Sequence, residues 1–326
     1  MSSELPRPTD NAFLGKDIKG GSHEPTYGGA LSFMRRRYSR DAGAADVVVS
    51  GVPWDGATTN RSGCRMGPRA IRAASAETAQ LNAFPWGFDP FETLRVIDWG
   101  DAWLDPHDPA SIPGAIEAHA AAILEAGAKM LTLGGDHFIT YPLLRAHAAK
   151  HGPLALVQFD AHGDLWSDRP GTMDHGTMMA RAVSEGVIEP GRSAQVGIRT
   201  FHDSDEGLDI LTAPFIHREG VRAAIEAVRG RVGDVPVYIS FDIDVLDPAF
   251  APGTGTPVPG GLASWQALEI MRGLGGLNLV GMDLVEVSPP YDTSEITAIA
   301  AATIAHDWLC LLAEKAGAAR VQVGRL

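Results

Sequence analysis

The sequence predicts a single α/β domain built around one mainly parallel β-sheet. Short apolar runs rich in Val and Ile recur along the chain, and stretches of helical character lie between them. Continuous apolar runs bounded by turn residues are typical of strands covered on both faces. Alternation of strand and helix through one chain favours a parallel sheet. In addition, acidic residues and histidines follow several of these runs directly, which suggests where a site forms.

The strands are expected where apolar and β-branched residues run without interruption. Seven runs have this character: residues 46–52, 94–100, 129–135, 154–160, 194–198, 235–242 and 277–287. The clearest helical patterns cover residues 114–128, 265–276 and 294–317. The first two end at glycines, as helix C-termini often do. The third is apolar on most faces and is therefore expected to be well buried.

The chain divides by composition into two parts. Residues 1–44 are predicted to form a polar N-terminal arm rich in Gly and Pro, and residues 45–326 a single α/β catalytic domain. The 326 residues are enough to bury a sizeable core.

Charge and cysteine content exclude several classes of protein. The net charge of −13 disfavours nucleic-acid binding, which needs a basic surface. It would favour a cationic small molecule by steering, although negative charge also simply keeps proteins soluble. Cys64 and Cys310 form no Cys-X-X-Cys pair, so a reduced, cytoplasmic compartment is expected. Residues 1–10 lack the blocks of a secretory signal, and the apolar run 296–305 is too short to span a bilayer, so no membrane partner is expected.

Histidines and acidic residues follow four of the predicted strands. Ligands of open α/β sheets bind beyond the carboxyl ends of the strands, so these side chains are expected to gather at one edge. They are His137, the group Asp160, His162 and Asp164, the pair Asp242 and Asp244, and Glu286.

The spacing within these clusters predicts a metal site. In an extended chain, residues i, i+2 and i+4 point to one side, so Asp160, His162 and Asp164 are expected to converge. Carboxylates at such short range cannot all stay ionised without a cation. One Asp-X-Asp pair alone is more often a cap or a solvated pair, and one Gly-Gly-Asp-His is mostly a turn. All three clusters together, each ending a strand-like run, favour metal binding.

Counting ligands favours two metal ions. The candidate ligands are the residues above without Glu286, which makes six. Two ions with about four protein ligands each need roughly eight ligand positions, so two carboxylates must bridge, and Asp160 and Asp242 are the expected bridges. Four carboxylates, two imidazoles and no thiolate favour Mn²⁺ over Zn²⁺, and Mg²⁺ suits the imidazoles less well. Ni²⁺ and Co²⁺ stay open.

These clusters resemble the metal motifs of the ureohydrolase family, which includes arginases and agmatinases. The motifs stand here as GGDH (134–137), DAHGD (160–164) and SFDIDVLDP (240–248), and the resemblance runs from about residue 28 to 315. It is strongest to the agmatinase branch. The segments that carry this likeness are residues 62–75, 84–101, 134–148, 173–179, 247–262 and 280–302.

The resemblance implies a fold and a role for each residue. It implies an arginase/deacetylase-like three-layer α/β/α sandwich that assembles into a trimer or hexamer. The implied metal ligands are His137, Asp160, His162, Asp164, Asp242 and Asp244. Glu286 corresponds to the glutamate that binds the guanidinium, and His175 in DHGT to the catalytic histidine, which would relay a proton. Asp164 is expected to accept the proton of the attacking hydroxide. Without the resemblance, His175 reads as a histidine at the start of a helix.

The sequence also departs from the family pattern near the second metal motif. Gly163 stands where Thr is common, and Trp166 follows where no aromatic residue is typical. Met179 stands where an aromatic is common. Trp166 is taken as a substrate-binding residue that packs on a methylene chain or a cation face. It could equally shorten the pocket, or be a core or interface aromatic.

The expected reaction is hydrolysis of agmatine to putrescine and urea, a step of polyamine biosynthesis, on a small cationic guanidino substrate with two Mn²⁺ per chain. The first alternative is the same chemistry on 4-guanidinobutyrate, 3-guanidinopropionate or guanidine. An alternative of another class is a catalytically inactive homologue with a binding role.

Overall fold

The computed structural model describes residues 11–14, 18–20, 24–79, 81–167, 169 and 171–321. One nine-stranded sheet forms its centre, with the strand order β1-β3-β2-β4-β9-β8-β5-β6-β7. Each strand is parallel to its neighbours. The predicted α/β class with a mainly parallel sheet is therefore confirmed.

The strands are short and mostly buried. They are β1 (Arg37–Tyr38), β2 (Val47–Gly51), β3 (Val96–Asp101), β4 (Lys129–Leu133), β5 (Ala155–Phe159), β6 (Ala194–Ile198), β7 (Asp209–Thr212), β8 (Pro236–Asp242) and β9 (Asn278–Val285). The α-helices of the described part are α1 (Asn11–Leu14), α2 (Gly67–Ser75), α3 (Ile112–Glu125), α4 (Thr140–His151), α5 (Met178–Ser184), α6 (Ala213–Glu219), α7 (Val221–Val232), α8 (Ser264–Gly273) and α9 (Ile296–Lys315).

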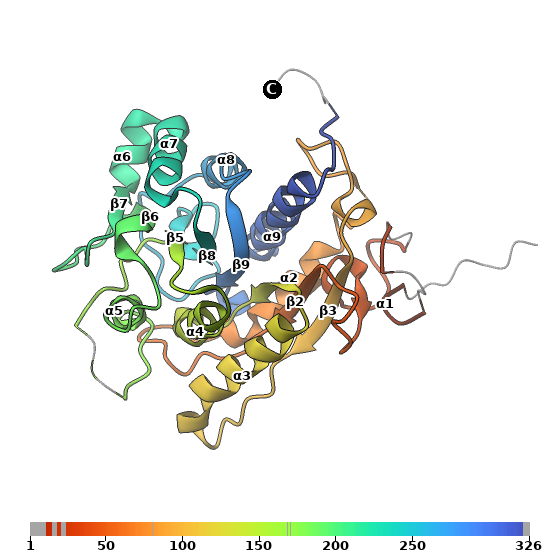
Figure 1. The fold of residues 1–326 in the computed structure, drawn as a ribbon, viewed down its shortest axis with the longest axis horizontal. Coiled ribbons are helices and arrows are strands. Elements are labelled where there is room, and N and C mark those ends of the chain that lie inside the picture. The colour runs from red at the N-terminus through yellow and green to blue at the C-terminus, as the bar shows by residue number, and fades with distance from the viewer. Residues whose placement is uncertain are drawn as a thin grey trace, which may run out of the picture.

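Helices cover both faces of the sheet, which gives the three layers (Figure 1). Helices α3, α4 and α5 pack on one face, and α2 with α6 to α9 on the other. Alternate residues of a strand enter opposite cores because successive side chains point to opposite faces. In β2, for example, Val47 and Val49 belong to one core and Val48 to the other.

All seven predicted strands are present, and two further strands lie at the edges of the sheet. β1 pairs with β3 and comes from the segment predicted as an arm. β7 pairs with β6 at the opposite edge. Both are short and partly exposed, so they lack the continuous apolar run that predicted the others. Part of the predicted arm lies outside the described residues, including residues 1–10. The expectation that these ten residues form no secretory signal is therefore not tested by the structure.

Helix α9 is long and largely apolar. By length and composition it could cross a membrane, but 78% of its most apolar stretch is buried inside the protein. The apolar run 296–305 was judged too short for a bilayer, whereas the helix that contains it extends to Lys315. Such burial is also found in the core helices of globular proteins, so α9 is weak evidence for a membrane span.

The sheet topology brings the candidate site residues together. The central strands β4, β9, β8 and β5 are direct neighbours. Each of them is followed at its carboxyl end by one of the predicted clusters, so the four clusters meet at one edge of the sheet.

Gly135, which links β4 to His137, tolerates no side chain. A Cβ atom at this position would lie 1.7 Å from the carbonyl oxygen of Trp54. We predict that Gly135→Ala lowers the free energy of unfolding by about 2 kcal/mol or more, because backbone rather than a flexible side chain must move. Gly114→Ala in α3 is the matched control, since a Cβ there meets no atom within 4 Å and alanine favours the helix. Differential scanning calorimetry would contradict the prediction if both variants melted alike.

Candidate active site

Two overlapping groups of side chains, all buried except the partly exposed His162, could each hold a metal ion. The first comprises His137, Asp160 and Asp242, and the second Asp160, His162 and Asp244. Within each group the candidate ligand atoms lie within 4.8 Å of one another. Asp160 belongs to both groups, and its bridging role stays a prediction. Asp242 belongs to the first group, so its bridging role stays a prediction.

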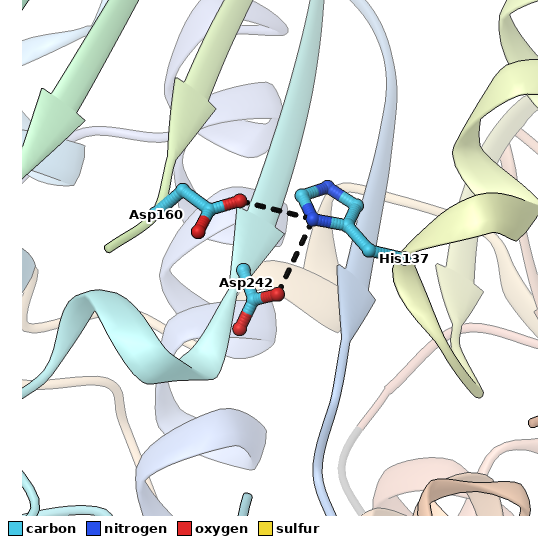
Figure 2. A group of neighbouring side chains, drawn as sticks. All are labelled: His137, Asp160 and Asp242. Carbon is cyan, nitrogen blue, oxygen red and sulfur yellow. Dashed lines mark ion pairs between the residues drawn. The ribbon is translucent and has the colours of Figure 1, made fainter. Parts of the chain in front are cut away.

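The first group is organised around one imidazole nitrogen. His137 Nδ1 lies 3.0 Å from Asp160 Oδ2 and 3.2 Å from Asp242 Oδ2, as Figure 2 shows. It also lies 3.0 Å from Asp164 Oδ2. Three carboxylates from the ends of β5 and β8 thus face one nitrogen that follows β4.

The second group uses the other oxygen of Asp160. His162 Nδ1 lies 3.4 Å from Asp160 Oδ1 and 3.1 Å from Asp244 Oδ2. Asp160 thus directs one carboxylate oxygen to each group, which is the geometry that a carboxylate shared by two cations requires.

The chain around these ligands is turned rather than extended, which corrects the spacing argument. β5 ends at Phe159, and residues 160–164 form an irregular loop in which Asp164 has a φ of 52°. Asp242 ends β8, but Asp244 lies in a 3-10 turn. The ligands converge because the loop is folded over the sheet edge, with Gln195 Nε2 donating to the Gly163 carbonyl at 2.6 Å. The strands therefore bring these residues to one edge of the sheet, and the loops after the strands set the directions of their side chains.

The electrostatics of the site favour a bound cation. Burial and the neighbouring Asp244 and Asp160 raise the pKa of Asp242 well above its usual range. Burial and Asp160 raise the pKa of Asp164 to about 6. Burial opposes a charged His137, yet the carboxylates outweigh it and raise the pKa of this imidazole well above its usual range. In the metal-free protein, a proton on His137 reduces the repulsion among the carboxylates that surround its Nδ1. A divalent cation at the same place would reduce this repulsion too, so the residues fit a metal centre.

Buried hydrogen bonds fix the orientation of His137. Its Nε2 lies 2.8 Å from Ser240 Oγ, and that hydroxyl donates to Asp283 Oδ1 at 2.8 Å. Because the hydroxyl proton goes to Asp283, Ser240 accepts from Nε2–H. Nδ1 therefore keeps its lone pair toward the carboxylates when the imidazole is neutral, as a metal ligand must.

A second pair of buried polar residues supports the loop 160–164. Gln158 Nε2 donates to Asp160 Oδ2 at 2.8 Å, and Gln195 Nε2 donates to Gln158 Oε1 at 2.7 Å. Neither these two residues nor Ser240 and Asp283 are among the site residues predicted from the sequence. The available signal was a polar residue inside an otherwise apolar buried strand, because such groups need a partner.

Glu286 follows β9 and presents one free carboxylate oxygen to the site. Its Oε1 accepts from the backbone N–H of His137 at 2.8 Å, whereas its Oε2 is buried without a hydrogen-bond partner among the described residues. The residue has a φ of 62°, a conformation that is strained for glutamate. Strain and a buried unpaired oxygen thus coincide at one residue beside the two groups.

His175 lies beside Glu286 in the turn before α5. Its Nδ1 is 2.9 Å from Glu286 Oε1, and its Nε2 contacts Thr59 Oγ1 at 2.8 Å. Burial disfavours the charged imidazole, but Glu286 raises the pKa of His175 to about 9. The described residues therefore hold a His175–Glu286 pair next to the two groups, in which Nδ1 faces the carboxylate and Nε2 accepts from the Thr59 backbone N–H at 3.1 Å.

A pocket of about 370 Å³ opens onto these residues. Predicted site residues in its lining are His137, His162, Asp164, Trp166, His175 and Asp242. The Trp166 ring lies 6.2 Å from that of His162, so the structure places Trp166 at the pocket rather than in the core. No lysine or arginine is found among the described lining residues, and the lining carboxylates make the pocket acidic. Asp168 and Pro170 of the adjoining loop lie outside the described residues.

Comparison with known proteins gives consistent matches. A model of the arginase family matches residues 45–310. A curated agmatinase from Chromobacterium violaceum is 59% identical over 308 residues, which cover 94% of this chain and 96% of that protein. The crystal structure of a hypothetical agmatinase from Burkholderia thailandensis has a TM-score of 0.93 at 59% identity, and the match covers 94% of this chain and 98% of that one. Proclavaminate amidino hydrolase from Streptomyces clavuligerus has a TM-score of 0.85 at 41% identity, with 89% and 99% covered.

The hydrogen bond from His137 to Ser240 predicts a defect in metal affinity. Ser240→Ala removes the acceptor that orients the imidazole, and such a loss typically weakens metal binding about 10- to 100-fold. Thr132→Val in β4 is the matched control, because the Thr132 hydroxyl is buried without a partner among the described residues. Calorimetric titration of the metal-free proteins with Mn²⁺ measures both. Equal affinities for the two variants would show that Ser240 does not orient the ligand.

Proposed function

The chain belongs to the arginase family, and from this premise we propose that it hydrolyses the guanidino group of agmatine to urea and putrescine. The observation that carries the proposal is the buried, unpaired Oε2 of Glu286 beside two groups of metal-ligand residues. A guanidinium offers paired N–H donors to a carboxylate in a planar geometry.

We propose that the six residues His137, Asp160, His162, Asp164, Asp242 and Asp244 hold two divalent ions, with Mn²⁺ preferred and Ni²⁺ or Co²⁺ as alternatives. Their donors are carboxylate oxygens and imidazole nitrogens without thiolate, which suits Mn²⁺. Ions bound there would supply hydroxide from water near neutral pH.

Glu286 positions the reacting carbon in this proposal. Its carboxylate pairs with the guanidinium and holds it over the edge of the sheet where the four ligand clusters meet. This pairing has two effects, because it binds the cation and also fixes the trigonal carbon for attack. The attack leads to a tetrahedral intermediate. Asp164 accepts the proton that the attacking hydroxide gives up, since its Oδ2 lies among the side chains proposed to hold the ions, 3.0 Å from His137 Nδ1.

His175 delivers a proton to the departing amine. Without substrate, His175 Nδ1 lies 2.9 Å from Glu286 Oε1, and this carboxylate stabilises the protonated form of the imidazole. When a guanidinium shares that carboxylate, His175 loses part of its charge stabilisation and becomes a better acid. The proton passes to the leaving nitrogen as the carbon–nitrogen bond breaks, so that this end of putrescine departs as a neutral amine and urea remains. The proton that Asp164 took from the hydroxide then passes to the freed amine or to solvent.

The charge of the pocket supports a substrate with a cationic tail. A carboxylate tail, as in 4-guanidinobutyrate or 3-guanidinopropionate, would need a lysine or arginine that the described lining lacks. Guanidine would leave most of the 370 Å³ unfilled. An inactive homologue has no need for two complete ligand groups and an unpaired Glu286 oxygen.

We further propose the setting of the enzyme. It acts as a homo-oligomer, a trimer or hexamer, in the cytoplasm and in the formation of putrescine for polyamines, without nucleic-acid or membrane partners. Residues 45–326 form the catalytic domain together with Phe33, Met34 and β1 of the preceding segment, which belong to its core and sheet.

Glu286→Gln is predicted to abolish most of the activity while metal content stays normal. The substitution keeps the size of the side chain and removes the charge that pairs with the guanidinium, which costs on the order of 2–5 kcal/mol in kcat/KM. Urea release and elemental analysis are measured on the same protein. A variant with near-normal efficiency would exclude Glu286 as the guanidinium partner.

A substrate panel tests the choice of agmatine. Urea release is measured from agmatine, arginine, 4-guanidinobutyrate, 3-guanidinopropionate and guanidine at equal concentrations, first with Mn²⁺ and then with Ni²⁺. We expect agmatine to have the highest kcat/KM, because its tail is cationic and carries no carboxylate. If another compound exceeded agmatine by about tenfold, which is about 1.4 kcal/mol, the agmatinase assignment would fail and a ureohydrolase assignment would stand.

A further inference from the structure

We propose that Asp174 binds the terminal ammonium group of the substrate and thereby selects a guanidino compound with an amine at its far end. The inference rests on the proposed function and names a residue of the same pocket. Asp174 is half-buried, lines the pocket and directly precedes His175 in the chain.

The Asp174 carboxylate is held in place and still has capacity for a ligand. Its Oδ1 accepts from the backbone N–H of Gly176 at 2.8 Å, which closes a tight turn. Its Oδ2 has no hydrogen-bond partner within the part of the chain that the structure describes. A fixed carboxylate with one free oxygen can accept a charge-assisted hydrogen bond without first losing side-chain freedom.

Asp174 and Trp166 are packed against the same glycine. A Cβ atom at position 176 would lie 2.9 Å from Trp166 Cε3 and 3.3 Å from Asp174 Oδ1. In addition, the Trp166 backbone N–H donates to the Gly176 carbonyl at 3.2 Å. The pocket therefore presents an aromatic ring and a carboxylate side by side on one wall. A methylene chain can pack along the ring while the ammonium at its end reaches the carboxylate.

The other carboxylates of the site are already assigned. Asp164 and Asp242 lie in the cluster around His137, and Glu286 pairs with His175 and the proposed guanidinium. Among the described residues that line the pocket, Asp174 is the carboxylate left for a second cation. The two ends of a dicationic substrate thus meet two separate carboxylates, Glu286 and Asp174.

The test compares Asp174→Asn with the parent enzyme, both loaded with Mn²⁺, on agmatine and on butylguanidine, which lacks the terminal amine. We expect kcat/KM for agmatine to fall about 10- to 100-fold, mainly through KM, since the lost contact is made equally before and during the reaction. Butylguanidine should be hydrolysed equally well by both proteins. Asp205→Asn is the matched control, because Asp205 closes the same Asp-X-Gly turn at 2.8 Å on the exposed surface and is absent from the pocket lining.

The outcomes separate this proposal from the proposed function. A loss of equal size on both substrates would mean that Asp174 acts through the turn that carries His175, and an unchanged agmatine value would also overturn the proposal. Calorimetric titration with putrescine and with butylamine adds a readout independent of turnover. Asp174→Asn should weaken the binding of putrescine and leave that of butylamine unchanged. If the parent enzyme hydrolysed neither guanidino compound, the proposed function would fail, and the putrescine titration would still decide the role of Asp174.

Discussion

Repulsion among buried carboxylates is the constraint on which the rest of this structure depends. Four neighbouring strands end at one edge of the sheet, and the turns that follow them bring Asp160, Asp164, Asp242 and Asp244 around two imidazoles. A divalent cation offsets this repulsion, whereas protons do so only in part. The repulsion therefore suits these residues to a metal centre, and the Glu286–His175 pair lies beside them.

Buried polar residues in four strands of the sheet hold the charged side chains of the site in place. Ser240 and Asp283 fix one imidazole from within β8 and β9, and Gln158 and Gln195 hold the Asp160 loop from β5 and β6. Each of these polar groups is buried and would be unfavourable there without its partner. Positive φ angles at Asp164 and Glu286 add local strain that the packed core supports. The site thus lowers the free energy of unfolding, and the packed apolar layers on either side of the sheet compensate for it.

The fold class and the meeting of the clusters were predictable because both follow from chain-local patterns, namely apolar runs and the residues that end them. The edge strands β1 and β7 were not, since they are short and partly exposed. The direction of the site side chains was not predictable either. The extended-chain argument for residues 160–164 was wrong because the conformation of Asp164 depends on long-range contacts such as the one between Gln195 and Gly163. The roles of individual site residues stay predictions, although the structure brings these side chains together.

The strand order also affects the folding of the chain during its synthesis. β8 and β9 occupy the centre of the sheet, yet they are encoded after every other strand, while their partners β4 and β5 emerge from the ribosome long before them. Until Pro236 and the residues beyond it are synthesised, β4 and β5 expose unpaired edges, and edges of this kind recruit other chains. Nascent chains are therefore vulnerable to aggregation until α9 closes over the sheet. A chain shortened from its carboxyl end would lose the middle of the sheet rather than a margin.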